Sequence, residues 1–297
     1  MASVEFISLL VSALLLAGIY AVMSVGMAVI YGVMKIVNLA HAGFMMLGAY
    51  FALELFERAH LHPILAAFVV FPIMFFMGRA VHWLFVRYLP HSDQPTLASL
   101  LLMFGLWLVL QNAGYLIWGN TDRSIFTSET LSVVHFGPIA VSSIRLIVFL
   151  AAVGCLVALQ VILNHTWFGR SLRALIQNRY AGQIVGVNSG YTASVTFGLG
   201  IAFAGLAGGL LASLYSFDPD FGRPFLIRSF VIIVLGGLES ILGVALGAIV
   251  LALVETFGIL FVPAGYQLAI SYGMLVVVLI ILPGGIVGLL DKLRRLA

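Results

Sequence analysis

Apolar residues in this chain fall in long continuous blocks, separated by short stretches that hold most of the charged and turn-forming residues. A helix that spans a bilayer needs roughly 17–25 predominantly apolar residues, and most of the blocks have that length. Strands of a membrane barrel would be shorter and would alternate in polarity. The pattern therefore predicts an all-α polytopic membrane protein with about eight or nine transmembrane helices. The expected spans are 6–31, 38–56, 62–86, 96–118, 141–163, 193–216, 226–238, 241–262 and 267–289.

One of these apolar pieces, 226–238, is too short to cross alone, because a helix rises only about 1.5 Å per residue. It is expected to be a broken or re-entrant element, either a half-helix or one arm of a bent hairpin. The first block is expected to be a retained span, since its apolar run is too long for a signal peptide. We treat 1–297 as a single transmembrane domain.

Pairs of glycines four residues apart place two small residues on one helix face, one turn apart, and so favour close helix packing. We interpret them as packing positions. The pairs are Gly205–Gly209, Gly243–Gly247 and Gly284–Gly288.

Basic residues are shared unevenly between the loops, and loops rich in lysine and arginine usually face the cytoplasm. With nine crossings and the N-terminus outside, nine of the 14 basic residues are expected to be cytoplasmic. These are Lys35, Arg79, Arg87, Arg170, Arg173, Arg179, Lys292, Arg294 and Arg295; the others, Arg58, Arg123, Arg145, Arg223 and Arg228, are expected in outer loops. A loop at about 165–192 therefore faces the cytoplasm in this topology.

The composition excludes a soluble protein of this length, because 63% of residues are hydrophobic and only 8% are charged. The net charge of +3 is assigned to basic cytoplasmic loops rather than to a nucleic-acid partner. A single cysteine, Cys155, provides neither a disulfide framework nor a thiol metal site. His60 and His62 do not form a compact ligand set, so no metal site is expected.

The segment GRSLRALIQNRYAGQIVGVNSG, residues 169–190, holds three arginines and no acid. Leu172, Leu175, Ile176 and Arg179 fall at helical spacing on one face, with Arg173 and Gln177 on another. This pattern predicts a short amphipathic helix over 169–181, followed by a glycine-containing turn. Such a helix either lies at the lipid headgroups, with its arginines on anionic lipid, or docks a soluble partner. The residues alone leave both readings open.

Several stretches resemble, in the same order, the inner-membrane permease subunits of branched-chain amino acid ABC importers. They are IYGVMKIVNLAHAGFMMLGAY (30–50), LLLMFGLWLVLQNAGYLIWG (100–119), IVLGGLESILGVALGAIVLALVETFG (233–258) and the run from Leu279 to Gly285. The basic segment resembles that family's coupling loop, matched here by Arg173, Ala174, Gln177, Asn178, Arg179, Ala181, Gly186, Val187 and Asn188. The family usually has an acid where this chain has Tyr180.

The resemblance implies a division of labour. Such permeases pair with a second, similar permease, with two ATP-binding-cassette ATPase subunits and with an external solute-binding protein, in the cytoplasmic membrane. ATP would be used by the partners, because this chain has no G-x-x-x-x-G-K-[ST] phosphate loop; no cofactor and no catalytic residue is expected on it. The residues implied to couple it to the ATPase are Arg170, Arg173, Gln177, Asn178, Arg179, Tyr180, Ala181 and Gly186.

Polar residues inside the spans are candidates for the substrate pathway, because burying them is costly unless they are paired or hydrated. An interhelical hydrogen bond is the alternative for each. Asn38 and His41 are expected on one helix face, and "GGLES" is expected to break a helix near a cavity. The candidates are Asn38, His41, Gln111, Asn112, Glu239, Ser240 and Glu255.

The leading hypothesis is the permease subunit of an importer of branched-chain or related amino acids. Urea or amides, organic acids or another small solute are alternatives within that class. A stand-alone secondary transporter or channel is a second class, which the scarcity of intramembrane acids counts against. A membrane-embedded enzyme would need an acid–base or metal cluster, and the sequence shows none.

Overall fold

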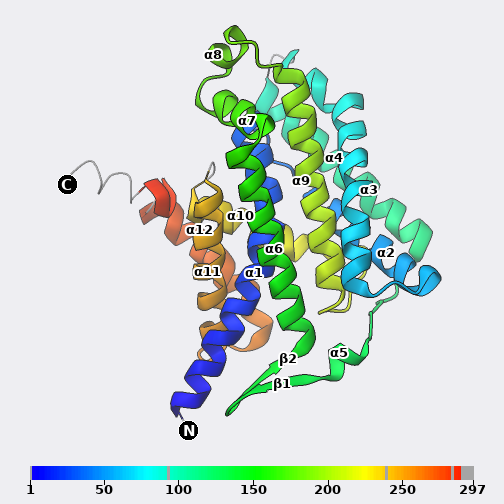
Figure 1. Ribbon diagram of the computed structural model, residues 1–297, viewed down its shortest axis with the longest axis vertical. Coiled ribbons are helices and arrows are strands. Elements are labelled where there is room, and N and C mark those ends of the chain that lie inside the picture. The colour runs from blue at the N-terminus through cyan, green and yellow to red at the C-terminus, as the bar shows by residue number, and fades with distance from the viewer. Residues whose placement is uncertain (1, 92–93, 238–239, 282–283, 289–297) are drawn as a thin grey trace.

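The computed structural model describes residues 2–91, 94–237, 240–281 and 284–288 of the 297-residue chain. The long elements are helices packed side by side (Figure 1). They are α1 (Ala2–Met34), α2 (His41–Ala59), α3 (Pro63–Leu84), α4 (Pro95–Trp118), α6 (Ser143–His165), α9 (Ser189–Ala212), α10 (Gly222–Gly236), α11 (Ile241–Gly258) and α12 (Gln267–Ile281). The shorter elements are η1 (Val86–His91), α5 (Ser128–Leu131), β1 (Val133–Phe136), β2 (Ile139–Ser142), α7 (Trp167–Gln177), α8 (Arg179–Ile184) and η2 (Ala264–Tyr266). The all-α polytopic prediction is confirmed.

Each of the nine predicted spans contains a helix, but the helices differ in their capacity to cross a membrane. Within the described residues, seven are long and apolar enough, all of the long helices except α2 and α10. The helix α2 carries Glu54, Glu57 and Arg58 near its end. The helix α10 has only 15 residues, or about 22 Å of length. The count of about eight or nine crossings is therefore higher than the seven that length and composition support.

The helix α2 begins inside the molecule rather than at its surface. The helix α1 ends at Met34, and Lys35 then turns the chain with φ 56°. At the start of α2, the His41 Nε2 atom lies 2.8 Å from the carbonyl oxygen of Met23. Met23 is 11 residues before the end of α1, or about 16 Å along its axis. The expectation that Asn38 shares a helix face with His41 is wrong, because Asn38 lies in the non-helical segment before α2.

The helix α9 is the centre of the packing, in contact with α1, α2 and α3. Glycines allow these backbones to meet closely. A Cβ atom on Gly208 would lie 1.9 Å from the Met45 carbonyl oxygen, and one on Gly48 would lie 2.1 Å from the Gly205 carbonyl oxygen. A Cβ on Gly205 would lie 2.4 Å from Met74 of α3, and one on Gly209 would lie 2.9 Å from Ala67, so the glycine pair 205–209 is a packing feature, as predicted.

The short piece predicted at 226–238 is the buried helix α10, which forms a hairpin with α11. The two backbones touch where the hairpin closes, since a Cβ on Gly236 would lie 2.1 Å from the Gly243 carbonyl oxygen. Gly237 ends α10 with φ 104°. This confirms the prediction of a broken element, one arm of a bent hairpin. Glu239 lies outside the described residues.

The two ends of the bundle differ in the elements they carry (Figure 1). The N-terminus and the antiparallel hairpin β1–β2 lie at one end, which we call the hairpin end. The helices α7 and α8 lie at the other, which we call the basic end because Lys35, Arg87 and Arg179 meet there. The sequence prediction missed the β-hairpin, although Gly137 (φ 60°) with Pro138 was a visible turn signal.

Replacing Gly208 by alanine should disrupt the contact between α2 and α9, because the added methyl group has no space beside the Met45 backbone. Overpacking of this kind costs about 1–3 kcal/mol, so the apparent Tm of the purified protein in detergent should fall. Gly154→Ala is the matched control, since nothing lies within 4 Å of a Cβ at that helical position. Equal Tm values for the two variants would contradict this packing.

Candidate functional site

The basic segment folds as two short helices at the basic end of the bundle (Figure 1). The prediction of one helix over 169–181 is wrong at Asn178, whose extended backbone (φ −157°) separates α7 from α8. The Asn178 side chain explains the break: its Oδ1 atom accepts a hydrogen bond of 3.0 Å from the Ala181 N–H and so caps α8. Asparagine is better suited to this cap than to a helix interior.

The helix α7 is tied to the membrane-spanning helices around it. Its apolar face is buried through Leu172 and Leu175, as predicted, and Ile176 packs against Gly32 of α1. The Arg173 guanidinium donates a hydrogen bond to the Leu163 carbonyl oxygen near the end of α6. Cations stabilise such C-terminal carbonyl groups. Arg173 therefore positions α7 on α6.

The helix α8, in contrast, is largely exposed. Tyr180 is 80% exposed, Ile184 85% and Val185 76%. Gly186 turns the chain toward α9 with φ 89°, as predicted. At the other end of the segment, the Arg170 guanidinium lies 4.6 Å from the centre of the exposed Trp167 ring. The apolar surface is thus concentrated on α8 and at the start of α7. Among the other predicted coupling residues, Gln177 and Ala181 are exposed.

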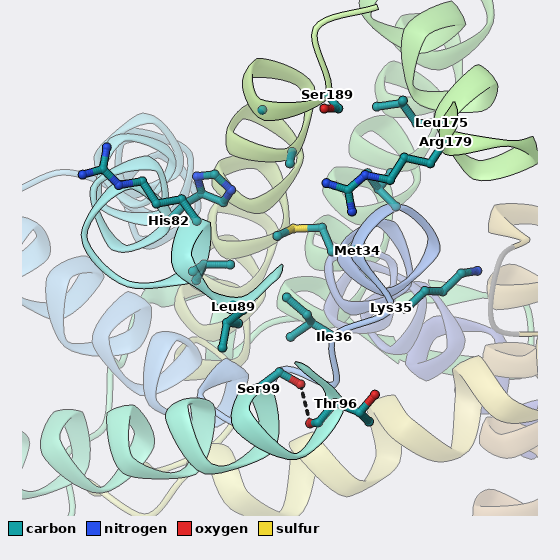
Figure 2. Close-up of a pocket in the computed structure, with 15 residues that line it drawn as sticks. Met34, Lys35, Ile36, His82, Leu89, Thr96, Ser99, Leu175, Arg179 and Ser189 are labelled. Atoms are coloured by element: carbon teal, nitrogen blue, oxygen red, sulfur yellow. Dashed lines mark hydrogen bonds between the residues drawn. The ribbon is translucent and has the colours of Figure 1, made fainter. Parts of the chain in front are cut away.

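Arg179 faces a cavity of about 380 Å³ behind α8 (Figure 2). The cavity lies between the basic-end portions of α1, α3, α4, α7 and α9. Arg87 and Lys35 also line it, and no acidic residue is among the lining residues that the structure describes. Polar groups from Thr96, Ser99 and Ser189 complete the wall. A displacement of α8 would therefore change the shape of a basic cavity that reaches the ends of the membrane-spanning helices.

A second candidate site lies deep between the spans, at the carboxylate of Glu255. Arg228 Nε donates to its two oxygens, at 2.9 and 3.2 Å. The Tyr20 hydroxyl lies 2.5 Å from Oε2, and the Ser271 hydroxyl donates to Oε1. These groups come from α1, α10, α11 and α12. The arrangement satisfies a buried charge with an ion pair and hydroxyl donors.

Sequence reasoning had selected Glu255 but not its partners. Arg228 was expected in an outer loop; the structure instead places it within α10, 8% exposed. Tyr20 and Ser271 carried no signal that separated them from other polar residues in apolar spans. The sequence did carry one signal for Arg228, because an apolar run follows it. A charge inside a membrane-spanning segment needs an opposite charge nearby, which would have suggested an ion pair.

The remaining pathway candidates have separate surroundings. Gln111 Nε2 donates to Asp220 Oδ1 at 2.6 Å, which ties α4 to the segment before α10, and the exposed Asn112 donates to the Leu108 carbonyl of its own helix. Ser240 caps α11 by accepting the Gly243 N–H at 3.0 Å. Asn38 is fully buried, and both polar atoms of its amide are without a partner among the described residues. Their role in a substrate pathway stays a prediction.

Comparison with known proteins identifies the family of membrane proteins to which this chain belongs. The family model described as "Branched-chain amino acid transport system / permease component" matches residues 9–279. The chain belongs to this family. The predicted resemblance is therefore confirmed, and the protein is a multi-pass inner-membrane permease. Permeases of ABC importers work with ATPase and binding-protein partners.

The permease is similar to several curated proteins over nearly its whole length. It is 25% identical to the high-affinity branched-chain amino acid transport system permease protein LivH of Salmonella typhimurium, over 95% of this chain and 96% of that protein. It is 28% identical to the permease protein BraD of Pseudomonas aeruginosa, over 96% of each chain. The probable LivH of Methanocaldococcus jannaschii is 25% identical over 97% of this chain and 95% of its own. No solved structure gives a significant match.

The capping role of Asn178 in this permease can be separated from a role in partner contact. Asn178→Ala should remove the cap, at a cost of about 0.5–2 kcal/mol, and should speed hydrogen exchange of the α8 amides. Asn178→Asp keeps an acceptor oxygen and should leave that exchange slow. Equal exchange in the two variants, followed by mass spectrometry, would contradict the cap.

Glu255→Gln should destabilise the permease strongly, because it leaves the Arg228 charge buried without its counter-ion. Removing one partner of a buried ion pair costs about 3–5 kcal/mol, measurable as a lower midpoint of unfolding in a denaturing detergent titration. Glu57→Gln, at an exposed position of α2, is the control and should leave the midpoint unchanged. A matching midpoint for the two variants would show that the pair is not needed.

Proposed function

We propose that this permease imports branched-chain amino acids, or closely related amino acids, which an external binding protein delivers, while ATP is hydrolysed on separate subunits. The named relatives support the solute class, since the LivH and BraD proteins are branched-chain amino acid permeases by name. Urea, amides or organic acids within the same importer class are the alternatives that an uptake assay must separate.

We propose that the permease assembles with a second homologous permease and with two ATP-binding-cassette subunits at the basic end, which would be cytoplasmic. The positive-inside rule supports this sidedness, because Lys35, Arg87 and Arg179 gather there. The chain itself would bind no cofactor. Its sequence has no phosphate-binding loop, so ATP would act through the partners.

The observation that carries the coupling mechanism is the contrast between α7 and α8. The helix α7 is fixed to α1 and α6 through Ile176 and Arg173, whereas α8 exposes Tyr180 and Ile184. An ATPase that binds the exposed apolar surface of α8 would therefore pull on a unit joined to the spans. ATP would favour one of two arrangements by differential contact, and access would alternate between the two membrane faces.

The exposed Tyr180 ring supports docking by apolar contact at the position where the family usually has an acid. An aromatic ring supplies a large contact area and a hydroxyl for a hydrogen bond. We therefore assign Tyr180 to packing in a groove of the ATPase rather than to a salt bridge.

The alternative, a stand-alone secondary transporter, would use Glu255 as an ion or proton relay. The structure favours a different role, because Glu255 is occupied by Arg228, Tyr20 and Ser271. Solute movement into liposomes that contain this chain alone, driven by an ion gradient, would favour the alternative.

Ile184→Glu should weaken ATPase binding, because it places a charge in an apolar contact. Loss of a central interface residue costs about 2 kcal/mol or more, roughly thirtyfold in Kd, so copurification of the ATPase and ATP-driven uptake should both fall. Leu131→Glu is the matched control, at 84% exposure near the hairpin end, against 85% for Ile184. Normal copurification and uptake with Ile184→Glu would rule out α8 as the docking element.

A further inference from the structure

A cavity of about 480 Å³ leads from the hairpin end toward the Glu255 cluster. Its rim includes Tyr215, which follows α9 and is 41% exposed, and Arg223, an exposed residue at the start of α10. Its deep wall includes Tyr20, Arg228 and Glu255. The volume falls within the roughly 300–1,000 Å³ of small-molecule sites.

The deep wall lies inside the bundle and nearer its hairpin end, because Glu255 is three residues before the end of α11 and the nearby Phe257 packs on Phe6 of α1. Tyr20 is 18 residues from the start of α1 and 14 from its end, or about 27 Å and 21 Å along the axis. A solute in this cavity would therefore be inside the bundle, within reach of the middle of α1. A charge buried there is expensive unless it is paired, and intramembrane charges usually mark function.

Arg228 has unused hydrogen-bonding capacity at this wall. Its hydrogen bonds to the described residues all run from Nε to Glu255. The two terminal nitrogens, with four N–H donors, have no acceptor among those residues. Rings flank the guanidinium, with the Phe225 centre at 5.6 Å and the Tyr20 centre at 6.0 Å. A planar guanidinium held in this way suits bidentate binding of a carboxylate.

The cavity also holds an acid that can receive an ammonium group. Asp220 is engaged by Gln111 and by Arg223, the latter at 3.1 Å. Asp218 uses Oδ1 to accept the Asp220 N–H at 3.1 Å, and its Oδ2 has no hydrogen bond to a described residue. The remaining wall is largely apolar and aromatic, provided by Leu16, Tyr215, Phe221, Pro224 and Phe225.

We propose that this cavity binds the main chain of an α-amino acid, with the carboxylate on the terminal nitrogens of Arg228 and the ammonium on Asp218. The inference rests on the proposed function and deepens it, since it gives the permease a solute site of its own. Recognition is of the zwitterion that all such amino acids share. The apolar wall accepts the side chain, and the binding protein supplies finer selectivity.

The test uses binding of radiolabelled L-leucine to the purified full chain in lipid nanodiscs, with two competitors that each lack one charge. The first, 4-methylpentanoate, keeps the carboxylate, and the second, 3-methylbutylamine, keeps the ammonium. Arg228→Lys retains the positive charge beside Glu255 but loses the two terminal nitrogens of the guanidinium. It should therefore weaken the binding of L-leucine and of 4-methylpentanoate by roughly tenfold and leave the binding of the amine unchanged. Asp218→Asn should weaken L-leucine and the amine and leave the acid unchanged.

Arg87→Lys is the control, since Arg87 lines the separate cavity at the basic end and the substitution should leave binding of all three ligands unchanged. Unchanged L-leucine binding in both Arg228→Lys and Asp218→Asn would overturn the proposal, as would a wild-type chain that fails to bind L-leucine at all. A third result would also count against the zwitterion: if Arg228→Lys weakens only the binding of 4-methylpentanoate and Asp218→Asn has no effect, the cavity binds an organic acid instead. ATP-driven uptake by the assembled importer is measured in parallel, because its absence would reject the proposed function and not the cavity.

Discussion

The carboxylate of Glu255 is the point on which the arrangement of α1, α10, α11 and α12 depends. A charge buried between membrane-spanning helices is costly unless it is paired, and here an arginine from α10 and hydroxyls from α1 and α12 satisfy it. Because α10 is too short to span the membrane, this ion pair gives a half-length helix a fixed position against a full-length one. The cavity that leads from the hairpin end lies beside this ion pair and is lined in part by the first turns of α10.

Two sites of different character are therefore joined by one helix. Tyr20 of α1 lies at the deep wall of the cavity that leads from the hairpin end, and Gly32 of the same helix receives Ile176 of α7. The two positions are about 18 Å apart along the axis. Between them, α1 packs on α9, where backbones meet at Gly26 and Gly200. Tightly packed backbones transmit displacement rather than absorb it.

The sequence predicted the features that depend on local length and period. All nine apolar blocks contain helices, and the buried face of α7 follows from the spacing of Leu172 and Leu175. The prediction failed where a side chain interrupts the helical hydrophobic period, as Asn178 does by capping α8. It failed again where the chain returns to the interior of the molecule before α2. It also failed for Arg228, whose partner lies 27 residues away, because a charge in an apolar run looks like a loop until its counter-ion is placed.

The length of α1 has a mechanical consequence. Its apolar stretch of 31 residues is about 46 Å long, whereas a bilayer core is about 30 Å thick. Hydrophobic mismatch of this size is relieved by tilt, and α1 runs obliquely to its neighbours (Figure 1). A tilted helix that is packed near its middle, as α1 is on α9 at Gly26 and Gly200, would pivot at that contact. A sideways displacement of one end would then move the other end in the opposite direction. The thickness of the bilayer would then set the resting tilt of α1, so the surrounding lipids would influence how a displacement at one end of this helix reaches the other.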